Sequence, residues 1–184
     1  MKERWENEIK VVPLSALVMS IPINIEKLLG GNTVENNRIE LKGGWNPDSI
    51  YRTICAFAND FEDNGSGYII VGVDENNGRP VRPVRGVPIE TIDRIEKEMV
   101  GFNNLFEPFY MPRVSVEDID GKKVIVIWAL AGDRRPYKIP ENVTAKHKTP
   151  KYFIRYNSST IEAKGENEME LIELANRVPF DDRG

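Results

Sequence analysis

The segment Gly67-Tyr68-Ile69-Ile70-Val71-Gly72-Val73-Asp74 decides the fold of this chain. Nearly every position between Tyr68 and Val73 is apolar, which predicts a central β-strand that is covered on both faces. Asp74 directly follows this strand, and open α/β sheets hold ligands at the carboxyl ends of such strands. The segment therefore predicts the middle of a sheet and one candidate site residue.

Local signals on either side of this strand predict the neighbouring elements. Arg38–Lys42 alternates between charged and apolar residues, which indicates a half-buried strand. Asn46-Pro47 predicts a helix start, and Asp120-Gly121 predicts a type I′ turn between two strands. We expect helices near 24–29, 46–61, 89–99 and 166–178, strands near 38–42, 68–73, 113–119, 123–130 and 152–156, an irregular segment at 79–87, and a long polar loop at 131–150.

The order of these elements predicts an α+β (α/β-like) fold, with a single mixed β-sheet and helices packed on it. The chain has 184 residues, which suffices for one domain with its own hydrophobic core. We expect an N-terminal extension at 1–21, the domain at 22–178 and a C-terminal tail at 179–184.

Composition excludes several classes of protein. The single cysteine, Cys55, and the single histidine, His147, leave no intramolecular disulfide and no Cys/His zinc site. Cys55 lies on the apolar stripe of its helix and is interpreted as a core residue. No run approaches the ~20 apolar residues of a membrane span and no signal peptide is recognisable, so we expect a cytoplasmic protein without a membrane partner.

Two familiar catalytic or cofactor motifs are also absent. Gly65-Ser66-Gly67 precedes its strand and does not lead from a strand into a helix, so it does not form a phosphate loop, and we expect no nucleotide cofactor. Ser158-Ser159-Thr160 has no histidine nearby in sequence, which argues against a serine triad.

Positive charge is concentrated late in a chain whose net charge is −4. The stretch from Arg134 to Arg155 holds seven basic residues and one acid, Glu141, with tyrosines and a phenylalanine between them. A charge run is commonly an ordinary solvated surface, but cations bind phosphates and aromatic rings stack on bases, so nucleic-acid binding stands as an equal alternative here. The candidate binding residues are Arg134, Arg135, Lys138, Lys146, Lys148, Lys151 and Arg155.

Three carboxylates form the candidate catalytic and metal-binding set. Glu35 and Glu40 lie five residues apart, so they converge only if Glu35 belongs to the loop before the strand. Asp74 supplies the third acid, with Glu75 as the alternative. Carboxylates from separate elements are what Mg²⁺ or Mn²⁺ needs to activate water against a phosphodiester. Taken singly, an acidic residue near the end of a strand more often lies on the solvated surface and has no catalytic role.

Several ordered motifs resemble the Schlafen AlbA-type domain family. Arg38-Ile39-Glu40-Leu41-Lys42 is similar to the family's Val-Glu-Phe-Lys strand, with Leu41 in place of the usual phenylalanine. The segments 54–59 and 67–74 resemble its most recognisable signature, and 136–137 with 152–160 resemble its closing strand. The similarity spans about residues 24 to 175 and implies an AlbA-like sandwich.

The resemblance implies contact with nucleic acid and leaves two activities open. In some Schlafen proteins three acids cleave structured RNA such as tRNA with a metal ion, and Glu35, Glu40 and Asp74 match that pattern. We therefore expect a metal-dependent endoribonuclease, with a non-catalytic DNA-binding module or transcription regulator as the alternative. Vertebrate relatives pair two such lobes into a clamp, and we hypothesise that a homodimer of this single domain restores it.

Overall fold

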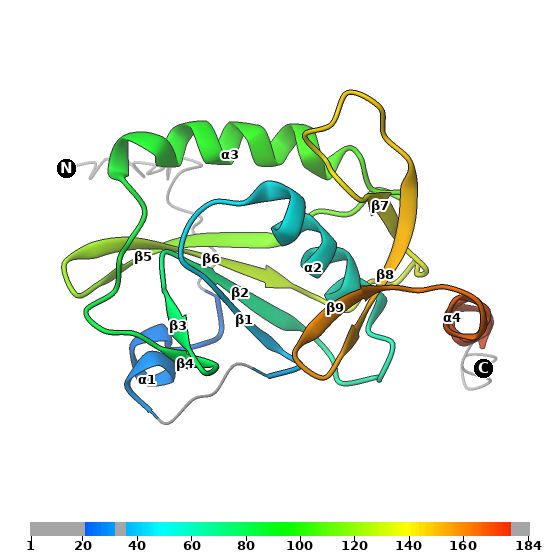
Figure 1. The fold of residues 1–184 in the computed structure, drawn as a ribbon, viewed down its shortest axis with the longest axis horizontal. Helices are drawn as coiled ribbons and strands as arrows, with labels where there is room; N and C mark the ends of the chain where they lie inside the picture. Colours follow the sequence, from blue (N-terminus) through cyan, green and yellow to red (C-terminus); the bar gives the residue numbers. More distant parts are fainter. Residues whose placement is uncertain (1–20, 32–35, 178–184) are drawn as a thin grey trace, which may run out of the picture.

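The computed structural model describes residues 21–31 and 36–177, which form two sheets, a small hairpin and four helices (Figure 1). The central sheet has the strand order β1-β2-β6-β5. β1 runs parallel to β2, and the remaining pairs are antiparallel, so the sheet is mixed. Its strands are β1 (Ile39–Lys42), β2 (Gly67–Val71), β6 (Lys122–Ala129) and β5 (Arg113–Ile119).

The apolar segment forms β2 in the interior of this sheet, as predicted. Ile69 and Val71 belong to the core on the side of α2, whereas Ile70 belongs to the core on the side of α1. All three side chains are fully buried. A strand between two hydrophobic cores must be apolar on both faces, which explains the lack of alternation.

The helices begin where the sequence predicts. Asn24 caps α1 by accepting from the Lys27 amide at 2.8 Å, and Asn46 caps α2 by accepting from the Ser49 amide at 3.2 Å. A side-chain oxygen in this position satisfies an amide that lacks a partner within the helix. The four helices are α1 (Ile25–Gly30), α2 (Pro47–Asn59), α3 (Ile89–Asn103) and α4 (Glu166–Asn176).

The predicted hairpin turn is also confirmed. Asp120 and Gly121 have φ values of 52° and 70°, the left-handed conformation that both central residues of a type I′ turn adopt. Ile119 pairs with Lys122 directly across the turn. This hairpin brings β5 and β6 together at one edge of the sheet.

The predicted polar loop at 131–150 is wrong in part, because its middle is a buried strand. β7 (Lys138–Pro140) pairs with β8 (Pro150–Tyr156), and β8 pairs with β9 (Ser159–Glu162), a strand that the sequence reading missed. Ile139 and Val143 are almost fully buried. A second small pair, β3 (Glu75–Asn76) with β4 (Arg79–Pro80), includes the start of the segment expected to be irregular.

The three-stranded sheet packs on the same helix as the central sheet. α2 contacts β2 on one side and β7, β8 and β9 on another, so it is sandwiched between the two sheets (Figure 1). The α+β class is confirmed, although the strands of the chain divide between two main sheets. Within the described residues no helix is long and apolar enough to cross a membrane.

Candidate nucleic-acid interface

Glu40 is a buried carboxylate held by two cations. It lies on the α2 side of β1 and is 8% exposed. Its oxygens lie 2.7 Å from the Lys42 ammonium and 2.7 Å from the Arg155 guanidinium. Arg155 is the ion-pair partner of Glu40 Oε2, and this oxygen makes no further hydrogen bond within the described residues. This residue therefore faces the interior, between β1 and β8.

Asp74 lies beyond the carboxyl end of β2 and is bound to a different cation. Its Oδ2 accepts from Arg85 Nε at 2.8 Å, and its carboxylate packs so closely on Gly43 that a Cβ added there would overlap it. Arg85 lines hollows formed with the segment 86–88 and is absent from the hollow that Glu40 lines. Glu75, the alternative acid, is exposed and accepts from the Gly78 amide at 2.6 Å.

The predicted metal-binding set is not assembled by the described residues. Glu35 lies outside them, and Glu40 and Asp74 each contact a cation where a metal ion would have to bind. Among the described residues no three histidine, cysteine or acidic side chains form a cluster suited to a metal ion. Glu40 Oε2 makes no hydrogen bond besides its ion pair with Arg155 among the described residues, and the metal-binding set remains a prediction.

Four of the seven predicted binding cations contact acids within the protein. Lys138 lies 3.1 Å from Glu107, and Lys151 lies between Glu141 at 2.7 Å and Glu162 at 3.1 Å. Both lysines donate hydrogen bonds to these carboxylates, and these bonds raise the pKa of each lysine above its usual value. The other two of the four are Arg135, which pairs with Asp60, and the buried Arg155.

The other three cations remain exposed and make no ion pair with a described acid. Arg134 donates to the Phe109 carbonyl at 3.3 Å, and Lys148 donates to the Ala145 carbonyl at 2.5 Å. Lys146 makes no contact of this kind. Lys146 and Lys148 lie on the loop between β7 and β8, which projects from the body of the molecule (Figure 1). These three side chains are accessible to a phosphate backbone.

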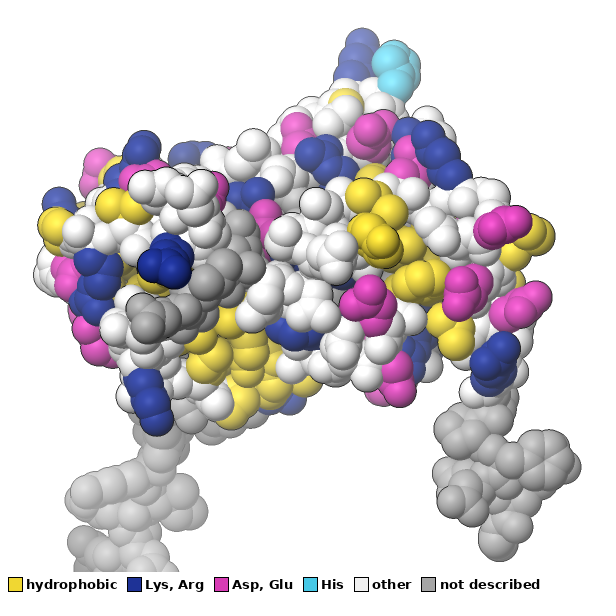
Figure 2. All heavy atoms as spheres, turned by 60° about the horizontal axis from the view of Figure 1, so that its bottom comes forward, with side chains coloured by type: hydrophobic (Ala, Val, Ile, Leu, Met, Phe, Trp, Pro, Cys, Tyr) yellow, Lys and Arg dark blue, Asp and Glu magenta, His cyan; other side chains and the backbone are white. Residues whose placement is uncertain are grey.

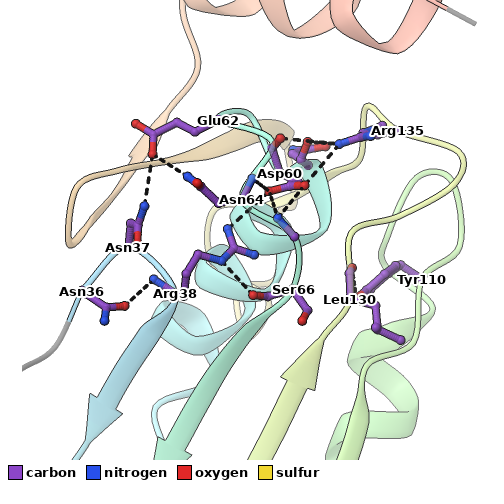
Figure 3. Close-up of polar contacts among 12 residues, drawn as sticks. Asn36, Asn37, Arg38, Asp60, Glu62, Asn64, Ser66, Tyr110, Leu130 and Arg135 are labelled. Atoms are coloured by element: carbon purple, nitrogen blue, oxygen red, sulfur yellow. Dashed lines mark hydrogen bonds and ion pairs between the residues drawn. The ribbon is translucent and has the colours of Figure 1, made fainter. Parts of the chain in front are cut away.

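Sequence analysis missed a buried carboxylate at the end of α2. Asp60 adopts a left-handed conformation (φ 43°), and its side chain accepts from the amides of Asn64 and Gly65. Arg38 and Arg135 approach it at 3.3 and 3.7 Å, as Figure 3 shows. Burial lowers the pKa of the Arg38 guanidinium, and the Asp60 carboxylate opposes that change. Asp60 thus ties β1, the turn after α2 and the 131–137 segment together.

Asn59, the last residue of α2, performs a similar structural task. Its side-chain amide donates to the carbonyls of Tyr137 and Phe153 at 2.9 and 2.8 Å and accepts from the Tyr137 amide at 2.6 Å. It is 1% exposed. Only a side chain with both donor and acceptor at one end can satisfy these backbone groups, so Asn59 anchors the second sheet to α2.

The model of the family described as Schlafen, AlbA_2 matches residues 35–164. The chain belongs to this family. The match covers β1, α2 and β2 and extends past β9, the part of the chain in which Glu40, Asn59 and Asp60 lie. Membership in the Schlafen AlbA_2 family supports a nucleic-acid-binding domain.

Two solved structures are similar to this Schlafen AlbA_2 chain. One is the N-terminal domain of a RecG-related protein from Nitrosomonas europaea, at 23% identity and a TM-score of 0.44, covering 68% of this chain and 76% of that one. The other is the DIP2311 protein from Corynebacterium diphtheriae, at 15% identity and a TM-score of 0.51. That match covers 79% of this chain but only 27% of DIP2311, and it bears on the fold alone. No curated protein matches the chain.

Proposed function

We propose that this protein binds nucleic acid through the phosphate backbone. The observation that carries the proposal is the exposure of Arg134, Lys146 and Lys148 without an acidic partner among the described residues, in a chain whose net charge is −4. Family membership supports the same conclusion. Contacts of this kind position a protein on a polynucleotide and carry no sequence readout by themselves.

The test is the salt dependence of binding to duplex DNA and to tRNA. Because each neutralised phosphate releases counterions, the double variant Lys146→Gln/Lys148→Gln is expected to bind more weakly and to lower the slope of log affinity against log salt by about two. Lys27→Gln/Lys122→Gln is the matched control, since both of its lysines are exposed outside the β7–β8 loop. Equal losses in the two double variants would contradict the proposed surface.

A second candidate function is metal-dependent cleavage of structured RNA such as tRNA. The specific observation in its favour is the buried Glu40 carboxylate, whose Oε2 makes no hydrogen bond besides its ion pair with Arg155 among the described residues. The deciding experiment incubates the purified protein with tRNA and with duplex DNA, each with and without Mg²⁺ or Mn²⁺. Metal-dependent tRNA cleavage supports an endoribonuclease, and intact RNA with measurable binding supports the DNA-binding or regulatory alternative.

A further inference from the structure

A polar pocket of about 270 Å³ lies between β1, the first turns of α2 and the β8–β9 turn. Side-chain hydroxyls make up much of its lining, and they come from two separate parts of the chain. α2 supplies two of them and the turn into β9 supplies the rest: Ser49, Thr53, Ser158, Ser159 and Thr160. A dense group of hydroxyls in one hollow offers hydrogen-bond donors that rotate to suit an oxygen-rich ligand.

The charged residues of the pocket make it electropositive. Three basic residues, Lys42, Arg52 and Arg155, line it together with one acid, Glu40, which leaves a formal charge of +2. This local excess contrasts with the net charge of −4 on the whole chain. Low-dielectric walls concentrate such a field, so the pocket attracts anions.

The deepest residues of the pocket are fixed in place. Arg155 Nη1 donates to Thr160 Oγ1 at 3.0 Å, and that oxygen lies 3.0 Å from Thr53 Oγ1. Arg155 is 3% exposed, and its Nε is a buried donor with no hydrogen-bond partner in the described structure. The Arg155 guanidinium also lies 2.7 Å from Glu40 and donates to the Asn36 carbonyl at 3.2 Å, so its charge is held in a fixed position beside the pocket.

The more accessible groups have hydrogen-bonding capacity to spare. The hydroxyls of Ser49, Ser158 and Ser159 make no hydrogen bond to a described residue. Arg52 uses only Nη1, which donates to the Glu141 carbonyl at 2.6 Å, so the rest of its guanidinium is available. A tetrahedral oxyanion with several acceptor oxygens matches this arrangement of donors.

We propose that this pocket binds one phosphate group of a nucleic-acid strand. Arg52 and Lys42 supply charge, Ser159 supplies a hydroxyl donor, and Arg155 acts from below as a positioning residue. A terminal phosphate monoester and an internal phosphodiester share this chemistry. The assignment rests on the proposed nucleic-acid binding for its biological ligand, but the pocket itself is testable with phosphate alone.

The first experiment measures thermal unfolding with increasing inorganic phosphate at constant ionic strength. Phosphate is expected to stabilise the wild type, with an apparent affinity about tenfold weaker in Arg52→Gln and about fivefold weaker in Ser159→Ala. Lys27→Gln, outside the pocket, is expected to respond like the wild type. The Ser159 hydroxyl has no described partner, so Ser159→Ala tests the pocket even if Arg52→Gln disturbs the 141–142 segment. A wild type that does not respond, or variants that respond equally, would overturn the proposal.

The second experiment compares 5′-phosphorylated and 5′-hydroxyl oligonucleotides of one sequence. A preference for the phosphorylated strand that Ser159→Ala removes assigns the pocket to a strand end. Equal affinities that Ser159→Ala weakens alike assign it to an internal phosphodiester, and no effect of Ser159→Ala on either strand overturns the assignment. If inorganic phosphate binds but neither oligonucleotide does, the proposed nucleic-acid function fails while the phosphate pocket stands.

Discussion

Neutralising Glu40 is expected to destabilise the fold before it affects any chemistry. Glu40 and Arg155 are 8% and 3% exposed and lie 2.7 Å apart. In Glu40→Gln the Arg155 charge stays buried without its carboxylate, and removing one partner of a buried ion pair costs about 3–5 kcal/mol. Lys42 is closer to solvent and can hydrate, so we expect the lower end, about 3 kcal/mol. A domain stable by 5–15 kcal/mol would stay folded but lose much of its margin.

A double-mutant cycle isolates this pair from its surroundings. Arg155→Met removes the cation and leaves Glu40 beside Lys42, and Glu40→Gln/Arg155→Met removes both charges. Because the double variant has no unpaired buried charge between these two positions, its loss of stability is expected to fall short of the sum of the single losses by 1 kcal/mol or more.

Urea unfolding at pH 7, followed by the fluorescence of the three tryptophans, measures these free energies. The measurement is repeated at 0.1 and 1 M NaCl, where a buried pair is screened far less than a surface pair. A loss below about 1 kcal/mol in Glu40→Gln, or single losses that add to within about 0.5 kcal/mol, would refute the reasoning.

Three further predictions test other parts of the fold. Asn59→Ala should cost about 3 kcal/mol in urea unfolding because it removes three buried hydrogen bonds to the backbone of Tyr137 and Phe153. Asn104→Ala, at an exposed helix end, should cost under 1 kcal/mol, and similar losses in the two variants would contradict the anchoring role of Asn59. Gly132→Ala should lower the melting temperature because its Cβ would overlap the Tyr137 ring, whereas Gly101→Ala, in open space on α3, should add about 0.5–1 kcal/mol; the reverse order would contradict the packing. Burial raises the pKa of the Cys55 thiol from 9.0 to about 12. The folded state therefore keeps this proton to higher pH than the unfolded state, and the stability that this provides below pH 9 is lost as the pH rises toward 12. The unfolding free energy of Cys55→Ala should fall less steeply than that of the wild type from pH 9 to 11, and parallel curves would contradict the buried thiol.

The elements that sequence predicts well are those encoded within a few neighbouring residues. Asn46-Pro47 starts α2 because the cap and the fixed proline φ act locally. Asp120-Gly121 makes its turn because both residues tolerate positive φ. β2 is recognisable because burial on two faces leaves a continuous apolar run.

The strand β7 was missed because its evidence lies elsewhere in the chain. Lys138–Pro140 is short and flanked by prolines and charges, which resembles a loop when read alone. Its pairing with β8 and its anchoring to Asn59 come from residues far away in sequence. Long-range pairing of this kind is what local pattern reading omits.

The charge count of the stretch from Arg134 to Arg155 overstates its unpaired positive charge for the same reason. The count included only Glu141 as an acid, yet Glu107 and Glu162 approach this stretch in the fold and bind Lys138 and Lys151. A net charge of +6 along the chain therefore becomes a smaller exposed charge in space. The cations still available to bind a phosphate are those without an acidic partner among the described residues, Arg134, Lys146 and Lys148.

This pairing changes how a loss of activity at Glu40 must be interpreted. If Glu40→Gln abolished cleavage of tRNA, the loss would have two explanations, removal of a metal ligand and an unpaired Arg155 inside the domain. Arg155→Met separates them because it breaks the ion pair and retains the carboxylate. The two variants are compared without urea, at a temperature where both are folded. If Glu40→Gln is inactive and Arg155→Met is active, the chemistry is assigned to the Glu40 carboxylate. Two equally inactive variants assign the loss to the Glu40–Arg155 pair as a whole, and the phosphate response of the pocket that both residues line then reports whether the site itself survived.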